Sequence, residues 1–226
     1  EVAIRLHKIS SDDLTEQNVG ELLGSMNGIC VPGGFGGRGI EGKVLAAKYA
    51  REEGVPYFGL CYGLHMAVID FARHVCGLQD ANSTEIDPLT PHPVICLLDA
   101  QQKITDKGGT MRLGAQTCEL TGGHAKAAYG TASVSERHRH RWEFNNEYRD
   151  QLEAAGMMFT GVGTDQDLVE IVEITGHPWF VAVQFHPEFK SKPTMPHPLF
   201  DGFVNAAMNT NANSTVGSAA GPQKTS

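Results

Sequence analysis

The segment Gly59-Leu60-Cys61-Tyr62-Gly63 presents a cysteine in the setting of a catalytic nucleophile. It has the form of a nucleophile elbow with cysteine in place of serine, a sharp strand-to-helix turn that leaves little room for flanking side chains. The thiol of Cys61 would sit at a helix N-terminus, where the helix dipole favours the thiolate. The alternative is a buried core cysteine, the usual state of a free cysteine. The flanking glycines favour the nucleophile.

A candidate base lies 125 positions later, in Gln184-Phe185-His186-Pro187-Glu188. Pro187 biases His186 away from helical geometry, and in an extended segment residues two apart point to the same side. Glu188 could therefore hold the imidazole, while His186 deprotonates Cys61 and later protonates the leaving group. The alternative is a surface histidine at a strand end. We give that interpretation to the other isolated histidines, which are His7, His74, His92, His124, His177 and His197.

The glycine-rich loop 33–37 follows an apolar segment and could turn backbone N–H groups toward a developing oxyanion. The N–H of Tyr62 is the natural second donor. A phosphate-binding loop is the rival interpretation, but the lysine–Ser/Thr pair of such loops is missing and the glycine spacing is not that of a dinucleotide site.

Arginine and histidine alternate from Arg137 to Arg141. On an extended segment the arginines share one face and the histidines the other. We expect Arg137 and Arg139 to be solvated or paired with acids. Alternating histidines also suggest a metal site, but no cysteine or carboxylate falls at ligand spacing, so none is expected.

Strand and helix patterns alternate around these motifs. The apolar segments 28–31 and 56–60 each precede a helical pattern, and Gly54 and Gly77 supply the stops. Such alternation predicts a three-layer α/β fold, with a mostly parallel central sheet covered by helices on both faces. The second half is richer in strands. Its expected strands are 94–98, about 111–113, 168–175 and 179–185, the last two adjacent through the turn 176–178; its expected helices are 147–155 and 199–208.

Composition limits the possible functions. The chain has 226 residues, enough for one α/β domain, and its net charge of −8 argues against a nucleic-acid surface. No apolar run reaches the roughly 20 residues of a membrane span. Five cysteines without a C-x-x-C pair predict reduced thiols in a cytosolic setting.

The two ends differ in kind. Residues 2–6 look like a strand that begins at once, so we interpret the chain as a fragment of a longer polypeptide. We place the folded domain at 1–208 and expect a disordered tail at 209–226, because that stretch has almost nothing to bury.

Together these motifs resemble the class I glutamine amidotransferases, a flavodoxin-like α/β family with a Cys, His, Glu triad in that chain order. Further stretches narrow the resemblance to the CTP synthase branch of that family. They are Val31 to Gly36 with Gly39 to Lys43, Asp80 to Glu85, Gly108 to Gly114, Glu136 to Arg141, and His186 to Phe189.

The resemblance implies roles for particular residues. Cys61, His186 and Glu188 would be the triad, and Gly34 would lie in the oxyanion loop. The expected glutamine contacts are Tyr62, Gly63, Leu64, His65, Glu85 and Arg141. Glu85 suits the α-ammonium of glutamine, and Arg141 suits its α-carboxylate. His65 stands where the family usually has glutamine, so we expect it to contact the substrate less well, unless it packs away from it.

The resemblance also implies partners outside the chain. An upstream synthase domain would use ATP and Mg²⁺ to activate UTP and aminate it with the released ammonia. GTP would activate glutamine hydrolysis, the whole enzyme would be a tetramer, and this domain itself would need no cofactor. Two alternatives stay open: a γ-glutamyl hydrolase on the same fold, and a catalytically silent domain kept for assembly or regulation.

Overall fold

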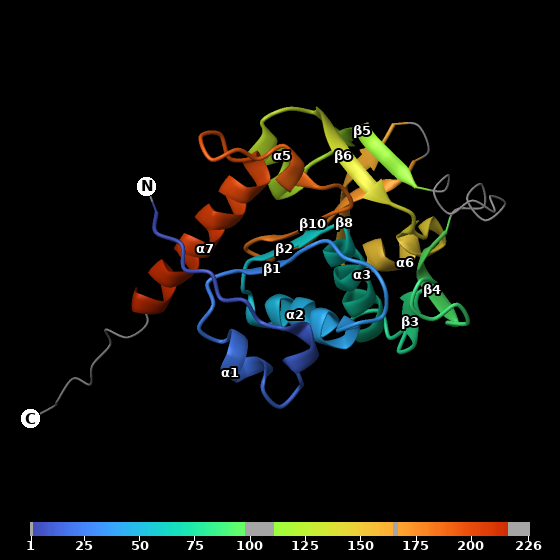
Figure 1. Ribbon diagram of the computed structural model, residues 1–226, viewed down its shortest axis with the longest axis horizontal. Helices are drawn as coiled ribbons and strands as arrows, with labels where there is room; N and C mark the ends of the chain where they lie inside the picture. The colour runs from blue at the N-terminus through green and yellow to red at the C-terminus, as the bar shows by residue number, and fades with distance from the viewer. Residues whose placement is uncertain (1, 98–110, 165–166, 217–226) are drawn as a thin grey trace, which may run out of the picture.

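The computed structural model describes residues 2–97, 111–164 and 167–216. Their central feature is a seven-stranded sheet in the order β1-β2-β10-β9-β8-β5-β6, beside a small sheet in the order β3-β4-β7 (Figure 1). The large sheet consists of β1 (Ile29–Val31), β2 (Tyr57–Leu60), β10 (Phe180–Val183), β9 (Val169–Ile174), β8 (Met157–Gly163), β5 (Arg112–Leu120) and β6 (Ser133–His140). The small sheet consists of β3 (Ala81–Ser83), β4 (His92–Cys96) and β7 (Glu143–Phe144).

The expected three-layer α/β class is confirmed, but the sheet is mixed rather than mostly parallel. β2 pairs in parallel with both β1 and β10, whereas the other four pairings of this sheet are antiparallel. The parallel part comes from the strand–helix alternation of the first half of the chain. The second half joins successive strands without such crossover helices, and therefore forms antiparallel pairs.

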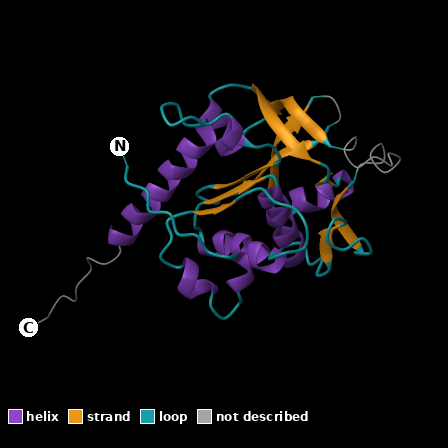
Figure 2. Cartoon of the chain, in the orientation of Figure 1, coloured by secondary structure: helices purple, strands orange, loops and turns teal. Residues whose placement is uncertain are grey.

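Helices cover both faces of the sheet (Figure 2). The α2 and α3 helices lie on one side, and α5 and α7 on the other (Figure 1). Strand β2 shows how two cores arise, because Tyr57 packs into the core on the α2 and α3 side while Phe58 packs into the core on the α7 side. The helices are α1 (Val19–Leu23), α2 (Ile40–Glu53), α3 (Tyr62–His74), α5 (Gly123–Tyr129), α6 (Arg149–Ala154) and α7 (Pro198–Val216), with 3₁₀ turns η1 (Ser11–Asp13), η3 (Asn146–Tyr148) and η4 (Pro187–Phe189).

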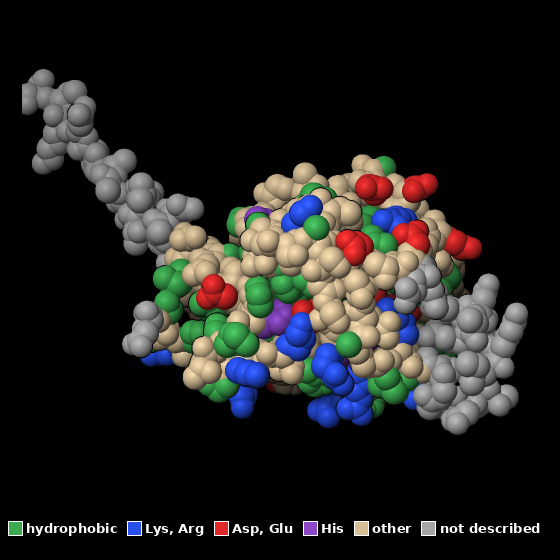
Figure 3. Space-filling view, turned by 90° about the horizontal axis from the view of Figure 1, so that it is seen from above, with side chains coloured by type: hydrophobic (Ala, Val, Ile, Leu, Met, Phe, Trp, Pro, Cys, Tyr) green, Lys and Arg blue, Asp and Glu red, His purple; other side chains and the backbone are tan. Residues whose placement is uncertain are grey.

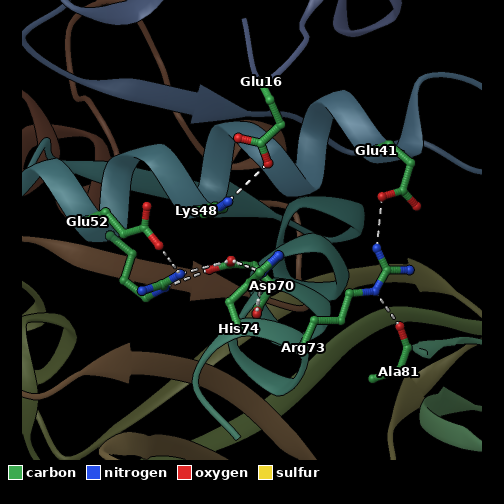
Figure 4. Close-up of polar contacts among 9 residues, drawn as sticks. Glu16, Glu41, Lys48, Glu52, Asp70, Arg73, His74 and Ala81 are labelled. Carbon is green, nitrogen blue, oxygen red and sulfur yellow. Dashed lines mark hydrogen bonds and ion pairs between the residues drawn. The ribbon is translucent and has the colours of Figure 1, made fainter. Parts of the chain in front are cut away.

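Ion pairs tie α2 to its surroundings (Figure 4). Arg51 of α2 binds Asp70 of α3, with Nε 2.8 Å from Oδ2 and Nη2 3.1 Å from Oδ1. His74, one turn after Asp70, places Nδ1 2.9 Å from the Oδ1 atom. Nearer the other end of α2, Glu41 pairs with Arg73 at 2.8 Å. These contacts hold the two helices in register beneath the strands that carry the site.

Most predicted elements of the first half are confirmed, including the helix that ends at Gly54, whose φ of 66° suits glycine. One expectation at the N-terminus is wrong. Residues 2–6 form no strand and their apolar side chains are exposed, because no described strand pairs with them. Helix α7 is assigned through Val216, and the disordered tail at 209–226 stays a prediction. Residues 217–226 lie outside the described part.

The surface charges are unevenly distributed. On the face seen from above, Lys and Arg side chains gather mainly along one margin and acidic side chains mainly along another (Figure 3). As expected, Arg137 and Arg139 of β6 are exposed. Among the described helices, none has both the length and the apolar character needed to cross a membrane.

Candidate active site

Cys61 sits at the junction between β2 and α3 with a strained backbone. Its φ of 48° and ψ of −96° are unusual for a residue with a side chain, and such conformations cost on the order of 1–3 kcal/mol. The surrounding glycines make the turn possible, since a Cβ on Gly63 would lie 2.3 Å from the Val31 carbonyl oxygen. The Cys61 N–H donates to the Val183 carbonyl at 2.7 Å, which fixes the turn to β10. The predicted sharp strand-to-helix turn at Cys61 is therefore present, and its role as nucleophile stays a prediction.

His186 and Glu188 lie just after β10, on the same side of the sheet edge as Cys61. The Nδ1 atom of His186 is 2.6 Å from Oε1 of Glu188. Because a carboxylate only accepts, Nδ1 carries the proton and Nε2 is the free acceptor of the ring. This Nε2 is buried and has no hydrogen-bond partner in the described part of the chain. The ring also stacks on Phe189, with centroids 4.9 Å apart.

Gly33 shows how close the histidine and the cysteine are. A Cβ placed on Gly33 would lie 2.9 Å from Cε1 of His186 and 3.7 Å from Cβ of Cys61. Both side chains therefore border one point in space, which glycine leaves open. The structure thus brings together the three residues predicted as a triad.

Burial dominates the ionisation of the Cys61 thiol. The side chain is 4% exposed, and the pKa of Cys61 is raised to about 12. Burial is the largest cause; the Tyr62 N–H lowers the pKa by a smaller amount, and the charge of Glu188 adds to the increase. The helix terminus acts in the expected direction, since the Tyr62 N–H favours the thiolate, but burial outweighs it. The thiol is protonated at neutral pH, so ionisation must be coupled to proton uptake by a base.

The glycine-rich loop is held by two side chains. The hydroxyl of Tyr62 donates to the Gly36 carbonyl, and the Gly36 N–H donates to Oε1 of Glu85 at 3.0 Å. Gly34 lies against the Tyr62 ring, since a Cβ there would be 3.4 Å from Cδ1. The Gly36 N–H is thus already used. The N–H groups of Gly34 and Tyr62 are the candidates that the sequence predicted for the oxyanion.

Glu85 and Arg141 are the predicted partners of a zwitterionic substrate, and the charge of Arg141 acts on Glu85. Burial raises the pKa of the half-buried Glu85, while the Gly36 N–H and the charge of Arg141 lower it. Gly63 and Leu64, which follow Tyr62 in the predicted set of glutamine contacts, pack inside the protein. Gly63 packs on Val31, and Leu64 is fully buried in the core.

His65 does not project into open space. Its ring is 2% exposed, and Nε2 lies 3.0 Å from Oε1 of Gln184. The Nε2 of Gln184 in turn lies 3.8 Å from Sγ of Cys61. Burial lowers the pKa of His65 to about 4, so the ring is neutral at physiological pH. The structure favours the alternative in which His65 packs inside the protein, and its contact with glutamine stays a prediction.

Sequence reasoning missed a buried charged cluster behind the triad. We call it the sheet cluster, and its members are Arg112, His138, His140, Glu143 and Glu170. His138 pairs with Glu170 and His140 with Glu143, each at 2.7 Å. The predicted division of faces on this segment is confirmed, because both histidines are buried. That alternation was the available signal, but their acidic partners come from other strands. No group of metal-ligating side chains was found among the described residues.

Comparisons with known proteins agree with this geometry. Residues 1–206 match the family described as "Glutamine amidotransferase class-I". The chain is 58% identical over 207 residues to a CTP synthase of Moorella thermoacetica and 56% identical over 210 residues to one of Chloroflexus aurantiacus. These alignments cover 91% and 92% of the chain but only 38% of each relative, so the chain spans well under half of their length.

A solved structure gives the same result at the level of the fold. The glutaminase domain of the Trypanosoma brucei CTP synthase, solved with bound acivicin, superposes with a TM-score of 0.85 at 37% identity. The match covers 92% of this chain and 82% of that one.

Proposed function

Because the chain belongs to the class-I glutamine amidotransferase family and corresponds to the glutaminase domain of CTP synthases, we propose that it hydrolyses L-glutamine to glutamate and ammonia at Cys61. The observation that carries the proposal is the strained Cys61 at the strand–helix junction, beside a histidine whose Nδ1 is held by Glu188. This arrangement has the logic of a nucleophile–base–orienter triad.

The reaction begins with proton transfer from the Cys61 thiol to Nε2 of His186. The sulfur attacks the side-chain carbonyl carbon of glutamine, and the oxyanion accepts hydrogen bonds from the N–H groups of Gly34 and Tyr62. His186 then gives its proton to the leaving nitrogen, which departs as ammonia and leaves a γ-glutamyl thioester. A water, deprotonated by His186, hydrolyses the thioester to glutamate and restores the thiol.

Two charged residues suit the ends of the substrate. Arg141 would bind the α-carboxylate of glutamine, and Glu85 the α-ammonium. The opposite charges of Glu85 and Arg141, of which the second acts electrostatically on the first, suit the two charged ends of such a ligand. A substrate ammonium would then compete with the Gly36 N–H for Glu85, which couples binding to the position of the glycine-rich loop.

The remaining steps belong to the whole protein. We propose that an upstream synthase domain uses ATP and Mg²⁺ to activate UTP, which the released ammonia converts to CTP, with GTP as activator. The relatives that carry the name CTP synthase are much longer than this chain, which leaves room for such a domain. A homotetramer and a cytoplasmic location belong to the same proposal, and the absence of disulfides among the five cysteines is in keeping with that location.

The decisive experiment is Cys61→Ala, measured as glutamate release from glutamine and as CTP formation from added ammonia in the full-length protein. We expect glutamine hydrolysis to disappear and ammonia-dependent CTP formation to remain. The matched control is Cys76→Ala, a partly exposed thiol beyond the end of α3, which should retain both activities. Loss of both activities in folded Cys61→Ala protein would contradict the division of labour.

A glutamine-like electrophile separates the alternatives. Covalent labelling confined to Cys61, read by peptide mass spectrometry, supports the glutaminase. A silent assembly domain would show no labelling. A γ-glutamyl hydrolase would be labelled but would release products from γ-glutamyl peptides faster than from glutamine.

A further inference from the structure

Gln184 is a buried amide that touches the sulfur of Cys61 and has no role in the reaction described above. It follows β10 directly and is completely inaccessible to solvent. Its backbone N–H donates to the Glu170 carbonyl at 2.8 Å, which fixes the main chain at this point. Its side chain spans the space between His65 and Cys61, with contacts of 3.0 and 3.8 Å.

The structure places the amide oxygen of Gln184 toward His65 and its NH₂ group toward Cys61. An amide oxygen only accepts hydrogen bonds, so the His65 nitrogen that faces it must carry a proton. His65 is neutral because it is buried, so it has one ring proton, and that proton must be on Nε2. The other nitrogen, Nδ1, is buried and unpartnered in the described part of the chain. The Trp142 backbone lies near the ring and raises the pKa of His65, against the larger lowering by burial, although no hydrogen bond of good geometry reaches Nδ1.

The orientation matters for the nucleophile. With its oxygen bound to His65, the Gln184 amide turns its NH₂ group toward Cys61, and this group can only donate. A thiolate in a buried site has little solvent to stabilise it, so each donor that faces it has a large effect. The reversed amide would instead direct an oxygen lone pair at the thiolate and oppose its formation. A neighbouring ring helps to fix the arrangement, because Tyr62 packs edge-on against His65 with centroids 5.7 Å apart.

We propose that Gln184 donates a hydrogen bond to the Cys61 thiolate, and that His65 is the positioning residue that keeps the donor end of this amide toward the sulfur. The inference deepens the proposed glutaminase mechanism and rests on it. It assigns to His65 a role inside the protein in place of a contact with substrate. It also adds a side-chain donor to the Tyr62 N–H at the nucleophile.

The test uses the rate at which iodoacetamide alkylates Cys61 between pH 6 and 10, since only the thiolate reacts. Gln184→Met removes the donor at similar volume and should slow alkylation about tenfold or more at each pH, as expected for a bond to a charged group. Gln184→Glu, which can place an acceptor there, should slow it further. His65→Phe should resemble Gln184→Met, whereas His65→Gln keeps a donor and should stay within about threefold of the wild-type rate. His74→Gln, on the same helix but outside the site, is the matched control.

A second measurement does not depend on the variants folding. The ¹⁵N chemical shifts of His65 in the wild-type protein should report a protonated Nε2 and an unprotonated Nδ1. The opposite tautomer, or a Gln184→Met variant that folds and alkylates at the wild-type rate, overturns the proposal. Because alkylation needs no glutamine, this result is independent of the hydrolysis assay. A protein that fails to hydrolyse glutamine but shows these alkylation rates would contradict only the proposed function.

Discussion

Two buried ion clusters in this domain have one guanidinium each but differ in how many buried carboxylates it serves. In the helix cluster, formed by Arg51, Asp70 and His74, the guanidinium binds one buried carboxylate with two nitrogens and also pairs with the exposed Glu52 (Figure 4). In the sheet cluster, Arg112 is shared between Glu143 at 3.1 Å and Glu170 at 2.8 Å. Both arginine side chains are similarly buried, with 13% and 17% exposed. The difference therefore lies in the compensation that each carboxylate receives.

The incompletely compensated cluster is the one whose charge reaches Cys61, the proposed nucleophile. Both oxygens of Asp70 have partners, whereas Oε2 of Glu143 and Nδ1 of His140 have none among the described residues. Burial raises the pKa of Glu143 to about 7, although Arg112 opposes the shift. The charge of Glu143 also reaches Cys61 and raises the pKa of the thiol. Asp70, with both oxygens paired, is suited to hold two helices together. Glu143, with one oxygen unpaired, ionises near neutral pH close to the site.

The largest effect should come from Arg112→Met. It leaves two buried carboxylates without their shared guanidinium, and we expect a loss of about 3 kcal/mol in the free energy of unfolding. That is the lower end for breaking a buried ion pair, because Glu143 can take up a proton. Urea denaturation measures the change. Arg139→Met, at an exposed position of β6, is the control and should stay within about 0.5 kcal/mol. Equal values for the two variants would mean that the sheet cluster contributes no net stability.

The second-largest effect should be the contribution of Glu143 to the pH dependence of the free energy of unfolding. A carboxyl whose pKa is raised in the folded state contributes stability below its unfolded pKa of 4.5 and loses that stability as pH rises through about 7. The loss from this group is up to about 3 kcal/mol. Glu143→Gln should remove this part of the slope, whereas Glu119→Gln, an exposed carboxylate on β5, should not. Parallel pH profiles for wild type and Glu143→Gln would refute the raised pKa.

Asp70→Ala should have a smaller effect, about 2 kcal/mol, although Asp70 is fully buried. The variant removes charge-assisted hydrogen bonds worth roughly 1.5–3 kcal/mol. Arg51 can then turn toward Glu52, which is already 3.1 Å away, and toward solvent. Glu153→Ala, an exposed carboxylate on α6, is the comparison in the same denaturation assay. A loss larger than that of Arg112→Met would reverse the order of the two clusters.

The smallest effect concerns His74, whose hydrogen bond to Asp70 raises the pKa of its imidazole. Its stabilisation is present below pH 6.5 and disappears as pH rises through the folded-state pKa. Because the side chain is 36% exposed, solvent screening keeps the effect well below 1 kcal/mol. Unfolding of His74→Gln and of Asp70→Asn, each between pH 5 and 8, should lack this component. An unchanged pH dependence in His74→Gln would assign it to another group.

How far each feature could be predicted from the sequence depends on how close its contacting residues are along the chain. Asp70 and His74 are one helical turn apart, and the elbow glycines lie two residues before and after Cys61, so short-range patterns contain both. The partners of His138 and His140 depend on strand order in two sheets, which no local pattern encodes. The same limit explains why β8 and α5 were not predicted. Helix α5 starts at Gly123, whose φ of 74° and contact with Glu173 depend on β9.

The burial of Cys61 also affects how readily this thiol is oxidised. Peroxides attack the thiolate, and oxidation beyond the sulfenic acid is irreversible for most proteins. A nucleophile that is protonated and 4% exposed while no substrate is bound is a poor target for such damage. The partly exposed Cys76 and Cys96 should be oxidised before it. Without substrate, the Cys61 sulfur would thus be protected from oxidation. Inactivation by peroxide should accelerate during glutamine turnover, because turnover forms the thiolate.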